Sequence, residues 1–74
     1  MKLIKLHMVY KKWDAKEGKD INDYKDLYVN IYHIGAFTEG NFIKNTTNLM
    51  LRNGWSCNVR ETTEEILELI KEVK

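Results

Sequence analysis

The sequence predicts an α+β protein that is mainly β: a curled antiparallel sheet or partly open small barrel of four to five strands with one C-terminal amphipathic helix. Three observations predict this class. Apolar residues alternate near the N-terminus, an Asn-Gly pair stands between two further alternating runs, and a helix-capping sequence precedes an apolar stripe with helical spacing. With 74 residues, the chain is expected to form a single small domain over residues 1–74.

Composition places the chain among globular proteins and argues against several classes of function. It is 43% hydrophobic and 31% charged and contains no proline, which is not the composition of a disordered segment. The net charge of +1 argues against nucleic acid as the partner, because phosphate contacts supply most of the affinity of such binders. Cys57 is the only cysteine, so neither an internal disulfide nor a cysteine-rich structural zinc site can form.

The hydrophobic segments are short. None approaches the roughly 20 apolar residues that span a bilayer, and the first residues lack the apolar segment of a secretion signal. We therefore expect no membrane insertion and a cytoplasmic location, in a bacterial cell or in the host of a virus. Without a metal or a disulfide, a domain of this size has little margin of stability, and self-association is expected to add to it.

The first third of the chain predicts a strand followed by a loop. Residues 2–10 alternate as a strand does. The residues that share its apolar face are Ile4, Leu6, Met8 and Tyr10. Residues 11–26 are rich in charges of both signs and predict a long polar hairpin loop, in which Trp13 is the anomaly.

The middle of the chain predicts a second strand and a turn. Residues 27–37 carry large side chains on both alternating faces, which motivates the curl of the sheet. Gly35-Ala36 are small residues at which a bulge or bend is expected. A turn centred on Glu39-Gly40-Asn41 is expected to follow.

Residues 46–62 predict a hairpin, because alternating runs flank an Asn-Gly pair. A two-residue loop at Asn53-Gly54 would mix polar and apolar side chains on both faces. A three-residue loop with a left-handed Gly54 separates them, placing Leu49 opposite Cys57 and Thr47 opposite Val59. We therefore expect the three-residue loop.

The C-terminal segment predicts a helix over residues 63–73. Thr62 and Glu65 have the spacing of a capping box, and the acidic and basic ends match the helix dipole. One apolar stripe follows, formed by Ile66, Leu67, Leu69, Ile70 and Val73. A helix of this length needs packing against the sheet to be stable.

The order of strand, strand, Asn-Gly hairpin and capping-box helix resembles the small flagellar and swarming motility family called FlbD or SwrD, and related short proteins of bacteriophages and gut bacteria. The resemblance covers about residues 27–71. The matching residues are Val29-Asn30, Ile34, Phe37, Leu49, Leu51, Asn53-Gly54, Val59-Arg60-Glu61-Thr62, Glu64, Glu65, Ile66, Leu69 and Ile70. The family joins its first two strands by a short Leu-Asn-Gly hairpin, where this chain carries residues 11–26. The resemblance implies no catalytic residue.

The sequence offers little catalytic or metal chemistry. Cys57 with His33 is the only possible nucleophile–base pair, and the expected hairpin register turns Cys57 toward the apolar face. No Asp or Glu stands at a ligand spacing from His7 or His33 within one element, so no metal site is expected. The four glycines are isolated and open no helix, which excludes the common phosphate-binding loops. We expect a protein that is not an enzyme and uses no cofactor.

Aromatic residues carry the functional expectations. They either fill a thin β core or subunit interface, or form a stacking platform or partner-binding groove. Any ligand pocket is expected at a subunit boundary, with the lining residues Trp13, Tyr32 and Arg52. The contact between copies in a homo-oligomer is expected at or near Tyr28, Tyr32 and Met50.

These expectations describe an oligomeric, non-enzymatic small interaction protein that binds a protein partner in a bacterial or phage cytoplasmic context. The alternative is a bacteriophage-type accessory or anti-defence protein. Such a protein would sequester a host factor or a small nucleotide at a subunit interface, through aromatic stacking and arginine.

Overall fold

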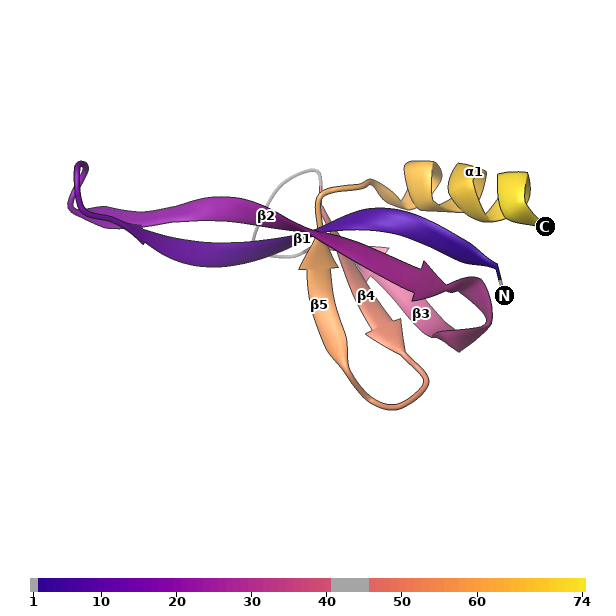
Figure 1. The fold of residues 1–74 in the computed structure, drawn as a ribbon. Coiled ribbons are helices and arrows are strands. Elements are labelled where there is room, and N and C mark those ends of the chain that lie inside the picture. The colour runs from indigo at the N-terminus through magenta and orange to yellow at the C-terminus, as the bar shows by residue number, and fades with distance from the viewer. Residues whose placement is uncertain (1, 41–45) are drawn as a thin grey trace.

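The computed structural model describes residues 2–40 and 46–74, and over these residues it contains five strands, a short 3₁₀ helix and one α-helix (Figure 1). In chain order the elements are β1 (Leu3–Asp14), β2 (Lys19–Asn30), η1 (Ile31–His33), β3 (Ile34–Glu39), β4 (Thr47–Leu51), β5 (Ser56–Val59) and α1 (Thr63–Val73). The strands form one open antiparallel sheet in the order β2-β1-β5-β4-β3. The predicted mainly-β α+β class is therefore confirmed.

The core lies between the inner face of the sheet and α1. Its buried hydrophobic side chains are Ile4, Leu6, Val29, Ile31, Leu49, Val59 and Ile66. The first half of β1 contributes two of them, whereas the second half of β1 contributes none. The long β1–β2 hairpin therefore extends well beyond the core, as Figure 1 shows on its left side.

The predicted polar loop over residues 11–26 is wrong, because most of this segment is strand. β1 and β2 pair continuously from Leu3 with Asn30 to Asp14 with Lys19. Only residues 15–18 form the turn, closed by the Gly18 N–H donating to the Asp14 carbonyl at 2.8 Å, with Gly18 at φ +65°. Two of the charges that resemble a loop along the sequence, Lys12 and Asp23, pair across the strands at 3.8 Å, and opposite charges on neighbouring strands stabilise a sheet.

The predicted strand over residues 27–37 is also wrong in its middle. β2 ends at Asn30, whose side-chain oxygen accepts the Tyr32 N–H at 3.0 Å and so initiates the single turn of η1. β3 then begins at Ile34. The bulge expected at Gly35-Ala36 is confirmed by a register shift between Ile34 and Ala36 in the β3–β4 pairing. Of the expected turn at residues 39–41, Asn41 lies outside the described residues.

The hairpin of β4 and β5 has the expected register. Leu49 pairs with Cys57, and Thr47 pairs with Val59. Gly54 has φ +91° and donates its N–H to the Leu51 carbonyl at 3.0 Å, as in a three-residue loop with a left-handed glycine. The predicted loop length and faces are therefore confirmed.

The helix α1 also begins and ends as predicted. Thr62 Oγ1 accepts the Glu65 N–H at 3.2 Å, and the Glu65 carboxylate accepts the Thr62 N–H at 3.3 Å. These two hydrogen bonds form the expected capping box. Ile66 is fully buried, and Leu69, Ile70 and Val73 pack against the core, whereas Leu67, expected in the same apolar stripe, is 57% exposed.

Candidate functional site

Three large aromatic side chains share the outer face of the β1–β2 hairpin, and we call them the aromatic stripe: Trp13, Tyr24 and Tyr28. Residues paired across two strands share a face, and alternate residues of a strand share a face. The pairs Trp13–Asp20, Val9–Tyr24 and Lys5–Tyr28 therefore lie on the same side, opposite to the core residues Ile4 and Leu6. The exposed fractions are 62% for Trp13, 45% for Tyr24 and 62% for Tyr28.

The outer part of the hairpin projects from the body of the protein, and we call residues 9–24 the arm. The only pair between β1 and β5 in the described chain is Met8 with Val59, so the arm has no third strand beside it. The molecule measures 44 × 23 × 23 Å, and the arm accounts for its elongation (Figure 1). An extended hairpin with exposed aromatic side chains offers a large surface to a partner.

Arg52 and Tyr32, two of the three predicted pocket residues, do line one hollow. This hollow has a volume of about 510 Å³ and lies between η1, β3 and the C-terminal end of α1. Its lining residues are Ile31, Tyr32, Ile34, Gly35, Ala36, Phe37, Arg52, Ile70 and Lys74. The lining combines an apolar floor with two cationic side chains and contains no carboxylate side chain.

Trp13 is not part of that hollow. At the strand rise of about 3.3 Å per residue, Trp13 lies about 33 Å along β1 from Leu3, which pairs with Asn30 next to η1. One chain therefore does not bring Trp13 to Tyr32 and Arg52. A pocket that contains all three residues requires a second chain.

The predicted contact residues between copies occupy two regions. Tyr28 and Met50 lie on the outer face of the sheet, because the register carries that face from β2 across to β4. They are separated by β1 and β5. Tyr32 lies on η1 and is 56% exposed, whereas Met50 is 39% exposed. The predicted self-association through these residues stays a prediction.

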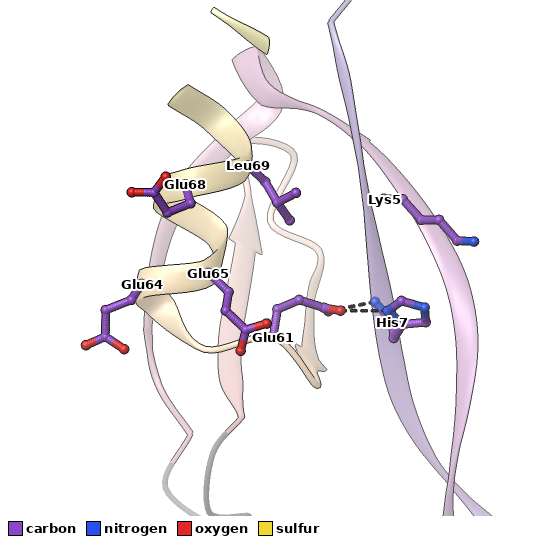
Figure 2. A pocket seen from close by; sticks show the side chains of 7 residues that line it. All are labelled: Lys5, His7, Glu61, Glu64, Glu65, Glu68 and Leu69. Carbon is purple, nitrogen blue, oxygen red and sulfur yellow. Dashed lines mark hydrogen bonds and ion pairs between the residues drawn. The ribbon is translucent and has the colours of Figure 1, made fainter. Parts of the chain in front are cut away.

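Glu61 and His7 form a polar site that the sequence did not reveal. Glu61, only 7% exposed, holds His7 by two hydrogen bonds: Oε1 accepts the His7 backbone N–H at 2.8 Å, and Oε2 accepts Nδ1–H at 2.6 Å. Figure 2 shows Glu61 reaching from the segment before α1 toward His7 on β1. The two residues are 54 positions apart, so no local motif could identify the pair.

The two hydrogen bonds between Glu61 and His7, which we call the clamp, fix the orientation of the imidazole. Arg60 Nη2 lies 3.3 Å from the same Nδ1, and Asp26 lies 3.9 Å from Nε2. Nδ1 cannot donate to Glu61 and accept from Arg60 at once, and the shorter distance assigns the proton to the Glu61 hydrogen bond. The neighbouring Arg60 guanidinium also lies over the ring of Tyr24, 5.2 Å from its centroid.

A shallow groove of about 480 Å³ runs beside this clamp, between β1 and α1. Its lining residues are Lys5, His7, Glu61, Glu64, Glu65, Glu68 and Leu69. Glu64 and Glu68 point away from His7 in Figure 2, so the carboxylates do not converge on one point. The lining contains no serine, threonine or cysteine beside the imidazole, and it therefore lacks a side-chain nucleophile for histidine to activate.

Cys57 and His33 do not form a catalytic pair in this fold. Cys57 packs against the core cluster, and burial raises the pKa of its thiol above the ordinary value of 9.0. A raised pKa disfavours the thiolate, which is the nucleophilic form. His33 lies on η1 and lines a separate hollow with Leu51, Arg52 and Asn53.

Within residues 2–40 and 46–74, no three His, Cys, Asp or Glu side chains are placed to hold a metal ion. No helix in the same residues is long and apolar enough to cross a membrane.

Comparisons with known proteins add no assignment. No family model matches the chain, and neither the curated proteins nor the solved structures contain a match. The resemblance to the FlbD or SwrD family therefore stays an expectation from the residues alone.

Proposed function

We propose that this protein is a non-enzymatic interaction module that binds a protein partner through the arm and the aromatic stripe. One observation carries the proposal: Trp13 and Tyr28 are each 62% exposed on the same outer face of a hairpin. Aromatic side chains that pack into partner pockets are the commonest energetic centres of protein interfaces. Trp13 lies on the arm and Tyr28 lies on the same face nearer the core, so one partner can contact both side chains.

The charge of this face favours a protein over a nucleic acid. Lys5 and Lys11 on β1, with Arg60 beside Tyr24, share this face with Asp20 and Asp26 on β2, so it carries charges of both signs. Lys5 already pairs with Asp26 at 3.5 Å. A phosphate backbone requires a net basic surface, whereas a protein partner can complement a face with both signs.

The test compares partner capture by matched variants. Immobilised wild-type protein is expected to retain a partner from cells that encode it, and the Trp13→Ala and Tyr28→Ala variants are expected to lose it. Leu67→Ala is the control, because Leu67 is 57% exposed but lies on α1 away from the stripe. Capture that is equal for the wild type and both stripe variants would contradict the proposal, and so would equal loss with Leu67→Ala.

A second candidate function is supported by the hollow at Tyr32 and Arg52, where an aromatic ring, an arginine and Lys74 surround an apolar floor. A small nucleotide suits this combination, because its base can stack and its phosphate can pair with the guanidinium. Titration with adenosine monophosphate is expected to show binding that weakens in Arg52→Met. Phe37→Tyr serves as a control that keeps both cations. Unchanged affinity in Arg52→Met would exclude this site.

A further inference from the structure

β2 is the outermost strand of the sheet, and one of its edges faces no other described strand. The His7 N–H donates to Glu61, and the His7 carbonyl accepts the Arg60 N–H at 2.8 Å, so both groups point away from β2. His7 and Asp26 are therefore a non-hydrogen-bonded pair, and the main-chain groups of Asp26 point to the free edge. Because the β1–β2 pairing is continuous, every second residue of β2 has its main-chain N–H and C=O on the free edge, and we call these the outward residues. Besides Asp26 they are Asp20, Asn22, Tyr24 and Tyr28.

This geometry restricts how β2 can pair with a second copy of itself. In an antiparallel pair, the residues that exchange main-chain hydrogen bonds stand directly opposite each other, so each outward residue of one copy must lie opposite an outward residue of the other. Two registers then use nearly the whole strand, one with Tyr24 opposite its own copy and one with Lys25 opposite its own copy. Shifting further in either direction places Asp23 or Asp26 opposite its own copy.

Side-chain charge distinguishes these registers. Like charges directly opposite each other destabilise a strand pair, so the registers centred on lysine or aspartate are unfavourable. The register centred on Tyr24 places no like charges opposite each other. It places Asp23 opposite Lys25 twice, and Ile21 opposite Leu27 twice.

We propose that two copies of this chain form a two-fold dimer by antiparallel pairing of their β2 edges, with Tyr24 at the axis. The dimer deepens the proposed interaction role, on which it rests, by naming a second copy as a partner of the arm. The pairing forms about ten main-chain hydrogen bonds and joins the two hairpins into a four-stranded sheet. A two-fold contact between identical surfaces is also the commonest form of self-association.

One hydrogen bond must change partner for this dimer to form. In the single chain, the Tyr24 N–H donates to Oδ1 of Asp23 at 2.8 Å, which covers one donor of the free edge. In the dimer, that N–H donates to the Tyr24 carbonyl of the other copy. The Asp23 carboxylate then lies opposite the ammonium group of Lys25 in the other copy, which replaces the lost hydrogen bond with an opposite charge.

Exchange of the two charges tests the register. Sedimentation equilibrium of the wild type is expected to show a mass that rises with concentration from 8.8 kDa toward twice that value. Asp23→Lys and Lys25→Asp should each raise the dimer dissociation constant about tenfold or more, and the double exchange should restore it to within about threefold of the wild type. A double variant no tighter than either single variant would refute the register. A wild-type mass fixed at 8.8 kDa would refute the dimer.

A second pair of variants is independent of the contacts that Asp23 and Lys25 make within their own chain. Asn22→Pro removes an outward N–H from an edge strand, where proline is tolerated, whereas Asn22→Ala keeps that donor. Asn22→Pro should be monomeric, and Asn22→Ala should dimerise as the wild type does. Circular dichroism and thermal unfolding must show that both variants are folded. Equal dimerisation of two folded variants would overturn the proposal.

The outcomes separate this proposal from the proposed function. Loss of partner capture in Trp13→Ala with unchanged sedimentation would support a heterologous partner and leave the dimer standing. A monomeric wild type that still captures a partner through Trp13 and Tyr28 would overturn the dimer alone.

Discussion

The Glu61 side chain continues the hydrogen bonding to β1 beyond the end of β5. β5 ends at Val59, and the Arg60 N–H makes the last main-chain hydrogen bond to β1. The Glu61 carboxylate then accepts the His7 main-chain N–H, which points to the same side of β1 as the His7 carbonyl. The Glu61 main-chain carbonyl accepts the hydroxyl of Thr47 at 2.8 Å. This one residue therefore connects β1, β4 and the start of α1.

Removal of that carboxylate should be costly. Glu61→Ala leaves the His7 N–H and Nδ1–H without their acceptor, and we expect a loss of about 2 kcal/mol in the free energy of unfolding. Glu64→Ala is the control, because Glu64 is exposed and its loss should change the stability by less than about 0.5 kcal/mol. Chemical denaturation of both variants measures the difference. Equal midpoints would show that the clamp does not stabilise the fold.

Asp23 gives a pH-dependent prediction within the arm. Its carboxylate accepts the Tyr24 N–H and, less strongly, the Tyr10 hydroxyl at 3.1 Å, and these hydrogen bonds lower the pKa of Asp23 below its ordinary value of 3.8. A lowered pKa in the folded state means that the stabilisation is present above the unfolded pKa and is lost as the pH falls through the folded pKa.

Tyr10→Phe should therefore raise the pKa of Asp23 while leaving it below 3.8, because the larger contribution from the Tyr24 N–H remains. Carboxyl chemical shifts followed by NMR during an acid titration measure the change, with both proteins in the Asn22→Pro background, so that the single chain keeps the Tyr24 N–H bond to Asp23. Tyr32→Phe is the control, since Tyr32 lies on η1 outside the arm. An Asp23 pKa that is the same in Tyr10→Phe and the wild type would show that the hydroxyl makes no stabilising bond in solution.

Among the elements, the β4–β5 hairpin and α1 could be predicted from the sequence because their signals are local. Gly54 and the capping pair Thr62 and Glu65 act within a few residues of their own position. The β1–β2 hairpin could not, because ion pairs such as Lys12 with Asp23 at 3.8 Å form only once the two strands lie side by side. The clamp of Glu61 on His7 joins residues 54 positions apart, so no local pattern in the sequence could predict it.

The helix cap predicts a moderate loss on substitution. Thr62→Ala removes the oxygen that accepts the Glu65 N–H, and we expect it to lower the free energy of unfolding by about 1 kcal/mol. Thr63→Ala, one residue later and inside the helix, should have a smaller effect or none. Urea denaturation compares the two variants, and an unchanged midpoint for Thr62→Ala would mean that the capping box contributes no stability.

The hairpin loop predicts a backbone effect. Gly54 has φ +91°, which a β-branched residue adopts only with strain, so Gly54→Val should cost more than about 1 kcal/mol. A Cβ added at Gly54 would meet no atom within 4 Å, so any loss must come from the backbone conformation. Gly54→Asn is the control, since asparagine tolerates the left-handed region. Equal stability of the valine and asparagine variants would contradict this explanation.

At the scale of the whole molecule, stability and binding surface are separated in space. The core and α1 occupy one end, and the arm projects from it (Figure 1). The arm carries partly paired charges and exposed aromatic side chains. On the arm face opposite the stripe, the Lys25 ammonium lies 4.8 Å from the centroid of the Tyr10 ring. A hairpin that adds little to the core is explained if its free edge and its outer face contact other molecules.

Amide hydrogen exchange as a function of protein concentration tests this claim most directly. The outward amides of Asn22, Asp26 and Tyr28 should become more protected as the concentration rises, because pairing of two β2 edges removes them from water. The amides of the β4–β5 hairpin should exchange at a constant rate over the same range. Exchange at Asn22, Asp26 and Tyr28 that does not change with concentration would contradict self-pairing through the β2 edge.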